Sequence, residues 1–193
     1  MQRVLLPILA AFGTLFCSFY KGPDAEVIIY EQTLNKLLQA IGEIKGQSEY
    51  KFWFKSGTYQ WSLRDTKIHL LHDSARFSTT ALVETGISDY EDVVDGKMSV
   101  RYDQKTNKIM IQLLDAPFEV YVKFLGKKFR ITTIQIADYF TEPMIFDGPA
   151  NTGTDISMTM PDGSIRRIQG KTTNTKLKIE SGKIRVSSDL QFR

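Results

Sequence analysis

The sequence has 193 residues, of which 42% are hydrophobic and 24% are charged, and its formal net charge is +3. This length and composition suit one domain with a sizeable hydrophobic core. The small net charge does not indicate a nucleic-acid-binding protein, for which a clustered basic surface is expected. The single cysteine, Cys17, leaves the rest of the chain without a disulfide or a catalytic thiol.

Residues 1–20 have the pattern of an export signal. Residues 4–20 carry no Asp, Glu, Lys or Arg, while Arg3 precedes the segment and Lys21 follows it. This arrangement is typical of a signal peptide. We therefore expect residues 1–20 to be a signal peptide or lipoprotein leader. The protein would then be exported, either to the periplasm or to a membrane-anchored position in the bacterial cell envelope.

This leader could be processed as a lipoprotein, cleaved as an ordinary signal peptide, or kept as a membrane anchor. Cys17 is a candidate lipidation site, but Phe16 occupies the position where lipoprotein processing requires a small residue. Ala11 and Gly13 have the spacing for ordinary cleavage after Gly13. A segment of about 17 uncharged residues is also at the lower limit of a membrane-spanning helix, so an uncleaved anchor is the third alternative.

We expect residues 24–193 to form a single β-rich domain that begins with a strand at Val27–Tyr30 and a helix. Four apolar residues of that helix have the spacing i, i+3, i+4 and i+7, which predicts one apolar stripe. They are Leu34, Leu37, Leu38 and Ile41. Gly42 is a typical helix stop.

After the helix the hydrophobic period becomes two, which predicts an antiparallel sheet. A turn is predicted at Lys55–Gly57, loops at Gly86–Asp95 and Glu142–Gly153, and one helical turn at Ala137–Phe140. The predicted strands are Tyr50–Phe54, Thr58–Leu63, Ile68–Leu71, Arg76–Glu84, Lys97–Tyr102, Ile109–Leu114, Phe118–Leu125 and Phe129–Ile136, followed by hairpins at Ile156–Ile168 and Lys176–Val186. One helix and about ten strands predict an antiparallel α+β domain.

Two segments, Ile109–Leu114 and Phe118–Leu125, have apolar residues on both strand faces, so both faces must be at least partly covered. Because the helix is short, cover must also come from the sheet folding over itself or from a bound apolar molecule. A packed core and an elongated lipid cavity are both consistent with this pattern. The candidate cavity-lining residues are Leu34, Leu38, Trp53, Trp61, Met98, Val100, Ile111, Leu113, Phe118, Val120, Val122 and Phe124.

The order of these parts resembles a known family. The leader ends at Cys17, a helix begins with the sequence Glu31–Leu38, and Gly96–Asp103 turns through Thr106–Lys108 into Ile109–Leu114. In this order the chain resembles the bacterial envelope lipoproteins related to YceB and, through them, the TULIP superfamily of lipid-binding domains. The resemblance implies a strongly curved, mostly antiparallel sheet with the N-terminal amphipathic helix packed on its concave face, and it supplies no catalytic residues. The second long helix of that family is replaced here by hairpins.

Candidate catalytic and metal-binding residues are few. His69 and His72 are three residues apart in a predicted strand, so they point to opposite faces and do not form a metal site. Glu91 and Asp92 lie in a predicted loop, where solvated carboxylates do not make a catalytic pair. The sequence has neither a phosphate-binding glycine loop nor a nucleophile elbow. We therefore expect a non-enzymatic protein without a cofactor or metal.

Two basic groups lie at hairpins: Lys127, Lys128 and Arg130 at one, and Arg166 with Arg167 at the other. They could contact an anionic membrane surface or simply keep the hairpin tips soluble. From these observations we expect an exported protein that binds a lipid or another elongated hydrophobic molecule in an apolar cavity between helix and curved sheet. The alternative is a structural or scaffold module with a packed core that binds a protein partner through an exposed strand edge.

Overall fold

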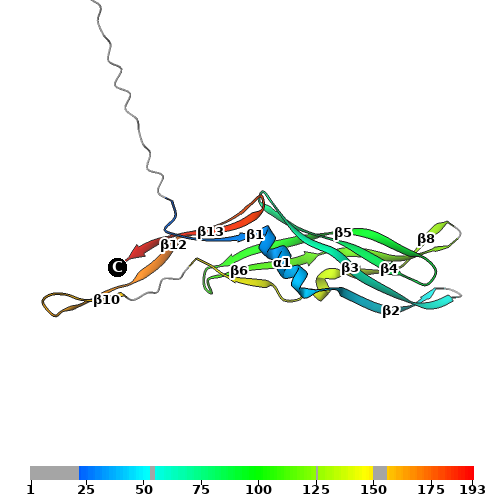
Figure 1. The fold of residues 1–193 in the computed structure, drawn as a ribbon, viewed down its shortest axis with the longest axis horizontal. Coiled ribbons are helices and arrows are strands. Elements are labelled where there is room, and N and C mark those ends of the chain that lie inside the picture. Colours follow the sequence, from blue (N-terminus) through cyan, green and yellow to red (C-terminus); the bar gives the residue numbers. More distant parts are fainter. Residues whose placement is uncertain (1–21, 53–54, 125, 150–155) are drawn as a thin grey trace, which may run out of the picture.

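The computed structural model describes residues 22–52, 55–124, 126–149 and 156–193 (Figure 1). The described residues form one α-helix, α1 (Glu31–Ile41), and one 3-10 helix, η1 (Ile136–Tyr139). The strands are β1 (Ala25–Tyr30), β2 (Ile44–Phe52), β3 (Lys55–Leu71), β4 (Ser74–Glu84), β5 (Asp89–Asp103), β6 (Lys108–Asp115), β7 (Pro117–Phe124), β8 (Lys127–Gln135), β9 (Met144–Asp147), β10 (Ile156–Thr159), β11 (Ile165–Ile168), β12 (Gly170–Glu180) and β13 (Lys183–Phe192).

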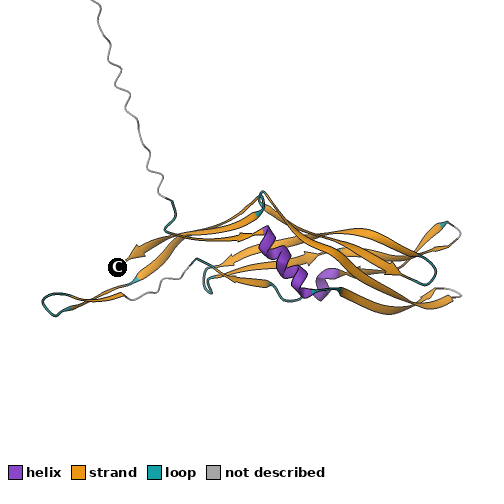
Figure 2. Ribbon diagram, in the orientation of Figure 1, coloured by secondary structure: helices purple, strands orange, loops and turns teal. Residues whose placement is uncertain are grey.

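The strands form an elongated, curled structure in which all pairings are antiparallel (Figure 2). Six strands make a half-barrel sheet in the order β2-β3-β4-β5-β6-β9. A three-stranded sheet has the order β1-β13-β12, and β7–β8 and β10–β11 are separate hairpins. The prediction of a mostly antiparallel, curved sheet with one helix is therefore confirmed.

The half-barrel is filled by two hydrophobic clusters. The first joins the six-stranded sheet to the β7–β8 hairpin, and its buried members include Trp61, Phe77, Phe118 and Val120. The second joins the sheet to α1 and to the three-stranded sheet, and its buried members include Leu34, Ile68, Ile109, Ile111, Ile184 and Val186. Met98 and Phe140 pack against both clusters. The hairpin thus covers one part of the curved sheet, and α1 with the three-stranded sheet covers the other.

Polar side chains attach α1 to an edge of β3. The Asn35 amide nitrogen donates to the carbonyl of Ile68 (3.1 Å), and the Asn35 oxygen accepts from the Ile68 backbone N–H (2.7 Å). A carboxylate oxygen of Glu31 accepts from the N–H of Leu70 (2.7 Å). These side chains occupy backbone groups that a neighbouring strand would otherwise pair. The helix ends at Gly42, which has φ = +82°, so the predicted stop is confirmed.

The predicted turn at Lys55–Gly57 is wrong. These residues lie in β3 and pair with Phe52, Lys51 and Tyr50 of β2. Gly57 is needed for a different reason, since a Cβ there would lie 2.9 Å from the Tyr50 ring. The glycine therefore permits a close contact between strands rather than a turn. Gly46 has a similar role, because its Cβ would lie 2.6 Å from the Trp61 ring.

Two predicted loops also contain strands. Residues Asp89–Asp95 belong to β5, where Tyr90 and Val94 are buried in the core and the three residues between them are exposed. This stretch has no apolar alternation, so the sequence did not indicate a strand. Within Glu142–Gly153, Met144–Asp147 forms β9, the edge strand that pairs with β6. The segment Ile68–Leu71 is the end of a continuous β3, whose register shifts between Arg64 and Lys67.

Candidate functional site

The structure divides the predicted cavity-lining residues between the two packed clusters. Those in the first cluster are Trp61, Leu113, Phe118, Val120 and Val122, and those in the second are Leu34, Leu38 and Ile111. All of these are buried, whereas Met98 and Val100 are half-buried. Trp53, Cys17 and the side chain of Phe124 lie outside the described residues. The predicted residues therefore mostly contact one another rather than open space.

A small cavity does lie between α1 and the sheet. Leu38 borders it from the helix, Ile68 and Ile111 border it from the sheet, and Phe140 and Met144 close it. Its volume is about 20 Å³, whereas pockets for drug-sized ligands hold roughly 300–1,000 Å³. Within the described part of the chain, this space accommodates about one water molecule.

A larger open groove of about 650 Å³ lies beside β5, and we call it the β5 groove. Its apolar lining comes from Ala75, Met98, Val100, Leu114 and Ile179. Charged residues of both signs surround this lining: Asp73, Arg76, Asp95 and Lys97. The sequence predicted Met98 and Val100 to line a cavity between helix and sheet rather than this groove, and it did not indicate Leu114 or Ile179.

The groove exists because β4 and β5 differ in length. Their pairing ends at Arg76 and Lys97, and β4 begins at Ser74, but β5 continues to Asp103. Among the described residues, Met98–Asp103 has a ladder partner only in β6. One edge of this segment therefore presents unpaired backbone groups.

Ser99 lies on this open segment. Its hydroxyl oxygen is buried, and it has no hydrogen-bond partner within the described part of the chain. A buried hydroxyl without a partner is uncommon in folded proteins, and its desolvation is unfavourable. Ser99 is also one of the residues that line the β5 groove.

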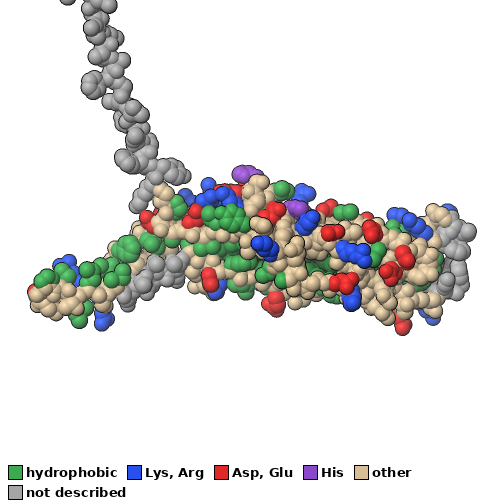
Figure 3. Space-filling model, in the orientation of Figure 1, with side chains coloured by type: hydrophobic (Ala, Val, Ile, Leu, Met, Phe, Trp, Pro, Cys, Tyr) green, Lys and Arg blue, Asp and Glu red, His purple; other side chains and the backbone are tan. Residues whose placement is uncertain are grey.

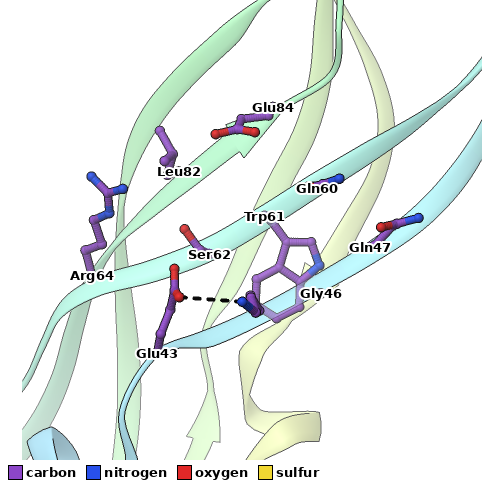
Figure 4. A pocket seen from close by; sticks show the side chains of 10 residues that line it. Glu43, Gly46, Gln47, Gln60, Trp61, Ser62, Arg64, Leu82 and Glu84 are labelled. Atoms are coloured by element: carbon purple, nitrogen blue, oxygen red, sulfur yellow. Dashed lines mark ion pairs between the residues drawn. The ribbon is translucent and has the colours of Figure 1, made fainter.

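A second depression, of about 500 Å³, lies across β2, β3 and β4 (Figure 4). Its polar lining includes Gln47, Ser62, Arg64 and Glu84. Glu43 and Lys45 form an ion pair of 3.8 Å there, and both side chains are more than half exposed. Exposed pairs of this kind contribute little stability and leave both groups solvated. Among the described residues that line the depression, the Glu43–Lys45 pair is the only ion pair.

The histidines and acids occupy separate positions. The His69 ring nitrogen contacts the Ser78 hydroxyl at 2.9 Å, and His72 lies 3.2 Å from the exposed carboxylate of Asp73. Among the described residues, no group of three or more His, Cys, Asp or Glu could hold a metal ion. Glu91 and Asp92 are exposed on β5 rather than in a loop.

Tyr90 is a buried titratable group whose pKa is shifted. Its hydroxyl donates to the Glu119 carbonyl (3.1 Å) and accepts from the Tyr121 backbone N–H (2.8 Å). Burial raises the pKa of Tyr90 to about 12, although the hydrogen bond from Tyr121 opposes the shift. A phenol with this pKa stays neutral at physiological pH. Its two hydrogen bonds join β5 to the β7–β8 hairpin.

The two basic groups differ in their contacts. At the β7–β8 hairpin, Lys128 lies 4.3 Å from the centre of the Tyr121 ring, and Arg130 pairs with Glu119 at 3.0 Å. Arg166 and Arg167 are exposed on β11. The first group therefore makes contacts within its own hairpin, which favours a stabilising role for it.

Together, these features define an antiparallel β half-barrel with a packed interior, an open strand edge and an exposed hairpin. No protein-family model matches the chain, and no curated protein matches it either. None of the helices in the described ranges is long and apolar enough to cross a membrane.

Proposed function

We propose that this protein is a non-enzymatic, exported envelope module that binds an extended segment of a protein partner in the β5 groove. The observation that supports this proposal is the open edge of Met98–Asp103 beside an apolar groove. The packed clusters favour this function over a lipid cavity, because the space between α1 and the sheet is only about 20 Å³.

The open edge supports a partner in extended conformation. An added strand pairs its backbone with unpaired N–H and C=O groups, and its alternate side chains enter neighbouring pockets. Here the side chains on one face of such a strand would meet Met98, Val100 and Ile179. Those near the rim would meet Arg76 and Asp95. We therefore propose a partner segment that alternates apolar residues with charged or polar ones.

Natural proteins usually block a free strand edge with charges, bulges or a covering element. The edge of β3 is blocked in this way by Asn35 and Glu31 of α1. The edge at Met98–Asp103 lies instead beside a groove that contains Ser99 and the exposed side chain of Leu114. This difference between two edges of one sheet supports a binding role for the second.

Site-specific photocrosslinking in cells that naturally make the protein tests this function. A photoreactive amino acid replaces Ser99 in the groove, and in a parallel strain it replaces Val93, which lies on the same strand outside the groove. We expect the label at position 99 to give a discrete adduct with another protein and the label at position 93 to give none. Leu114→Arg should abolish the adduct by placing a charge in the apolar lining, whereas Val93→Arg should leave it unchanged.

The adduct's mass distinguishes the alternatives. A phospholipid adduct at position 99 would contradict the protein partner and favour a lipid in the groove. An adduct that survives Leu114→Arg, or equal labelling at both positions, would contradict binding at this site. Native mass spectrometry of the purified protein tests the separate cavity hypothesis, because co-purifying lipid would require an interior space larger than the one described.

A further inference from the structure

The β10–β11 hairpin extends away from the half-barrel at one end of the molecule (Figure 1). Every side chain of β10 is exposed, and on β11 only Ile168 is partly covered. None of the described hairpin residues belongs to either hydrophobic cluster. An isolated two-stranded hairpin is only marginally stable in water. A partner surface would therefore stabilise this one.

One face of the hairpin is mainly apolar. Directly opposed residues of an antiparallel pair share a face, and the register pairs Ile156 with Ile168 and Met158 with Arg166. Ile156, Met158 and Ile168 therefore form an apolar stripe with one arginine. Ile156 and Met158 remain 46% and 50% exposed, and with Ile168 they form a contiguous apolar surface rather than isolated apolar residues. Figure 3 shows hydrophobic side chains along this projecting part of the molecule.

The charge of the chain is unevenly distributed. Residues 156–193 contain eight Lys and Arg and three Asp and Glu, a net charge of +5. Residues 22–149 contain fifteen Lys and Arg and eighteen Asp and Glu, a net charge of −3. An anionic surface would therefore attract the C-terminal part of the molecule and repel the rest.

The N-terminal end of the domain lies close to the same hairpin. Asp24 accepts a hydrogen bond from the Leu190 backbone N–H (2.9 Å), and Ala25 pairs with Ser188. The base of the hairpin is fixed where Gln169 and Arg193 exchange two backbone hydrogen bonds of 2.9 Å. Along β13, Ser188 and Arg193 are separated by about 17 Å. The start of β1 thus lies at the end of the domain that carries the hairpin.

From these observations we infer that the β10–β11 hairpin lies on the surface of an anionic phospholipid membrane. Ile156, Met158 and Ile168 enter the interface between headgroups and acyl chains. Arg166 extends from the same face toward the phosphates, as long basic side chains do beside apolar surfaces. Arg167 adds electrostatic attraction from the opposite face. This inference uses none of the residues of the β5 groove and does not depend on the proposed partner.

Spin-label measurements on the full chain test the inference. In a Cys17→Ser background, Met158→Cys places a single label on the apolar stripe, and Val93→Cys places a matched label on the half-barrel. Both proteins are mixed with vesicles of phosphatidylcholine alone or of phosphatidylcholine with phosphatidylglycerol. Accessibility of the label to oxygen and to a water-soluble nickel complex then reports whether each site enters the membrane. Circular dichroism shows that each variant is folded.

With phosphatidylglycerol we expect the label at position 158 to become accessible to oxygen and shielded from nickel, while the label at position 93 stays exposed to nickel. Arg166→Gln with Arg167→Gln should raise the anionic lipid concentration needed for half-maximal shielding by about 30-fold, because each near-surface charge adds about 1 kcal/mol. Added salt should have the same effect as the arginine substitutions.

Three results would overturn the inference. The first is a label at position 158 that stays exposed to nickel on vesicles that carry the protein. The second is equal shielding on neutral vesicles together with no effect of the arginine substitutions. The third is shielding that depends on protein concentration without vesicles, which would identify a second copy of the chain as the occupant. Loss of the groove adduct in cells would not change any of these readouts.

Discussion

The Tyr90 hydroxyl connects β5 to the β7–β8 hairpin within the first hydrophobic cluster, and a single substitution can remove this hydroxyl. Its hydroxyl makes hydrogen bonds with the Glu119 carbonyl and the Tyr121 N–H, and its ring stacks on Tyr121 with centroids 3.9 Å apart. Tyr90→Phe keeps the ring in place and removes both hydrogen bonds. The substitution therefore measures how strongly the hydroxyl attaches β5 to the β7–β8 hairpin.

The backbone N–H of Tyr121 would be left without its partner. Because Tyr121 is buried, this loss should lower the free energy of unfolding by about 1–3 kcal/mol at neutral pH. The raised pKa of Tyr90 adds a dependence on pH. Burial favours the neutral phenol in the folded state. The contribution of neutral Tyr90 to the free energy of unfolding is therefore complete below about pH 10 and decreases as the pH approaches 12. Over this interval the free energy of unfolding of wild type should fall by up to about 3 kcal/mol relative to that of Tyr90→Phe.

Urea unfolding of both proteins at neutral pH and at several alkaline pH values measures these changes. The difference between the two proteins isolates Tyr90 from other groups that titrate in the same range. Tyr59→Phe is a matched control, since Tyr59 is also buried and its hydroxyl makes no hydrogen bond to any of the described residues. The reasoning is refuted if both substitutions destabilise equally, or if the difference between wild type and Tyr90→Phe stays constant above pH 10.

Three further substitutions test how α1 is held. Leu34→Ala, at a fully buried position, should lower the free energy of unfolding measured in urea by about 2–5 kcal/mol. Leu37→Ala, at an exposed position of the same helix, should lower it by less than about 1 kcal/mol. Equal effects of the two substitutions would contradict the placement of the helix. Asn35→Ala should cost about 1–3 kcal/mol and speed hydrogen exchange at the Ile68 amide, and unchanged exchange there would contradict the edge contact.

The elements that the sequence predicted correctly depend on local signals. The spacing from Leu34 to Ile41 and the stop at Gly42 define α1 without reference to the rest of the chain. The turns near Asn107 and Gly182 also formed as expected, because both residues adopt the positive φ that such turns require. Secondary structure that is determined within about ten residues could therefore be predicted.

The errors arose where tertiary contacts determine the role of a residue. Gly57 was predicted to lie in a turn, but it lies in a strand, where the lack of a side chain leaves room for the Tyr50 ring on the neighbouring strand. The β5 groove depends on where β4 begins relative to the end of β5, and no local pattern encodes that difference in strand length. Apolar residues on both faces of Ile109–Leu114 predicted cover on both sides, but only the face of Ile109, Ile111 and Leu113 is buried. On the other face Met110 is half-buried and Leu114 is exposed. The pattern could not distinguish a packed interior from a hollow one.

The two proposed surfaces are related through β12. This strand begins at Gly170, beside the base of the β10–β11 hairpin, and Ile179 near its other end lines the β5 groove. Nine residue steps along a strand correspond to about 30 Å. If the hairpin lies on a membrane, the groove is held up to about that distance from the lipid surface. A partner that reaches the groove would therefore present its extended segment in the aqueous compartment, while the hairpin contacts the membrane.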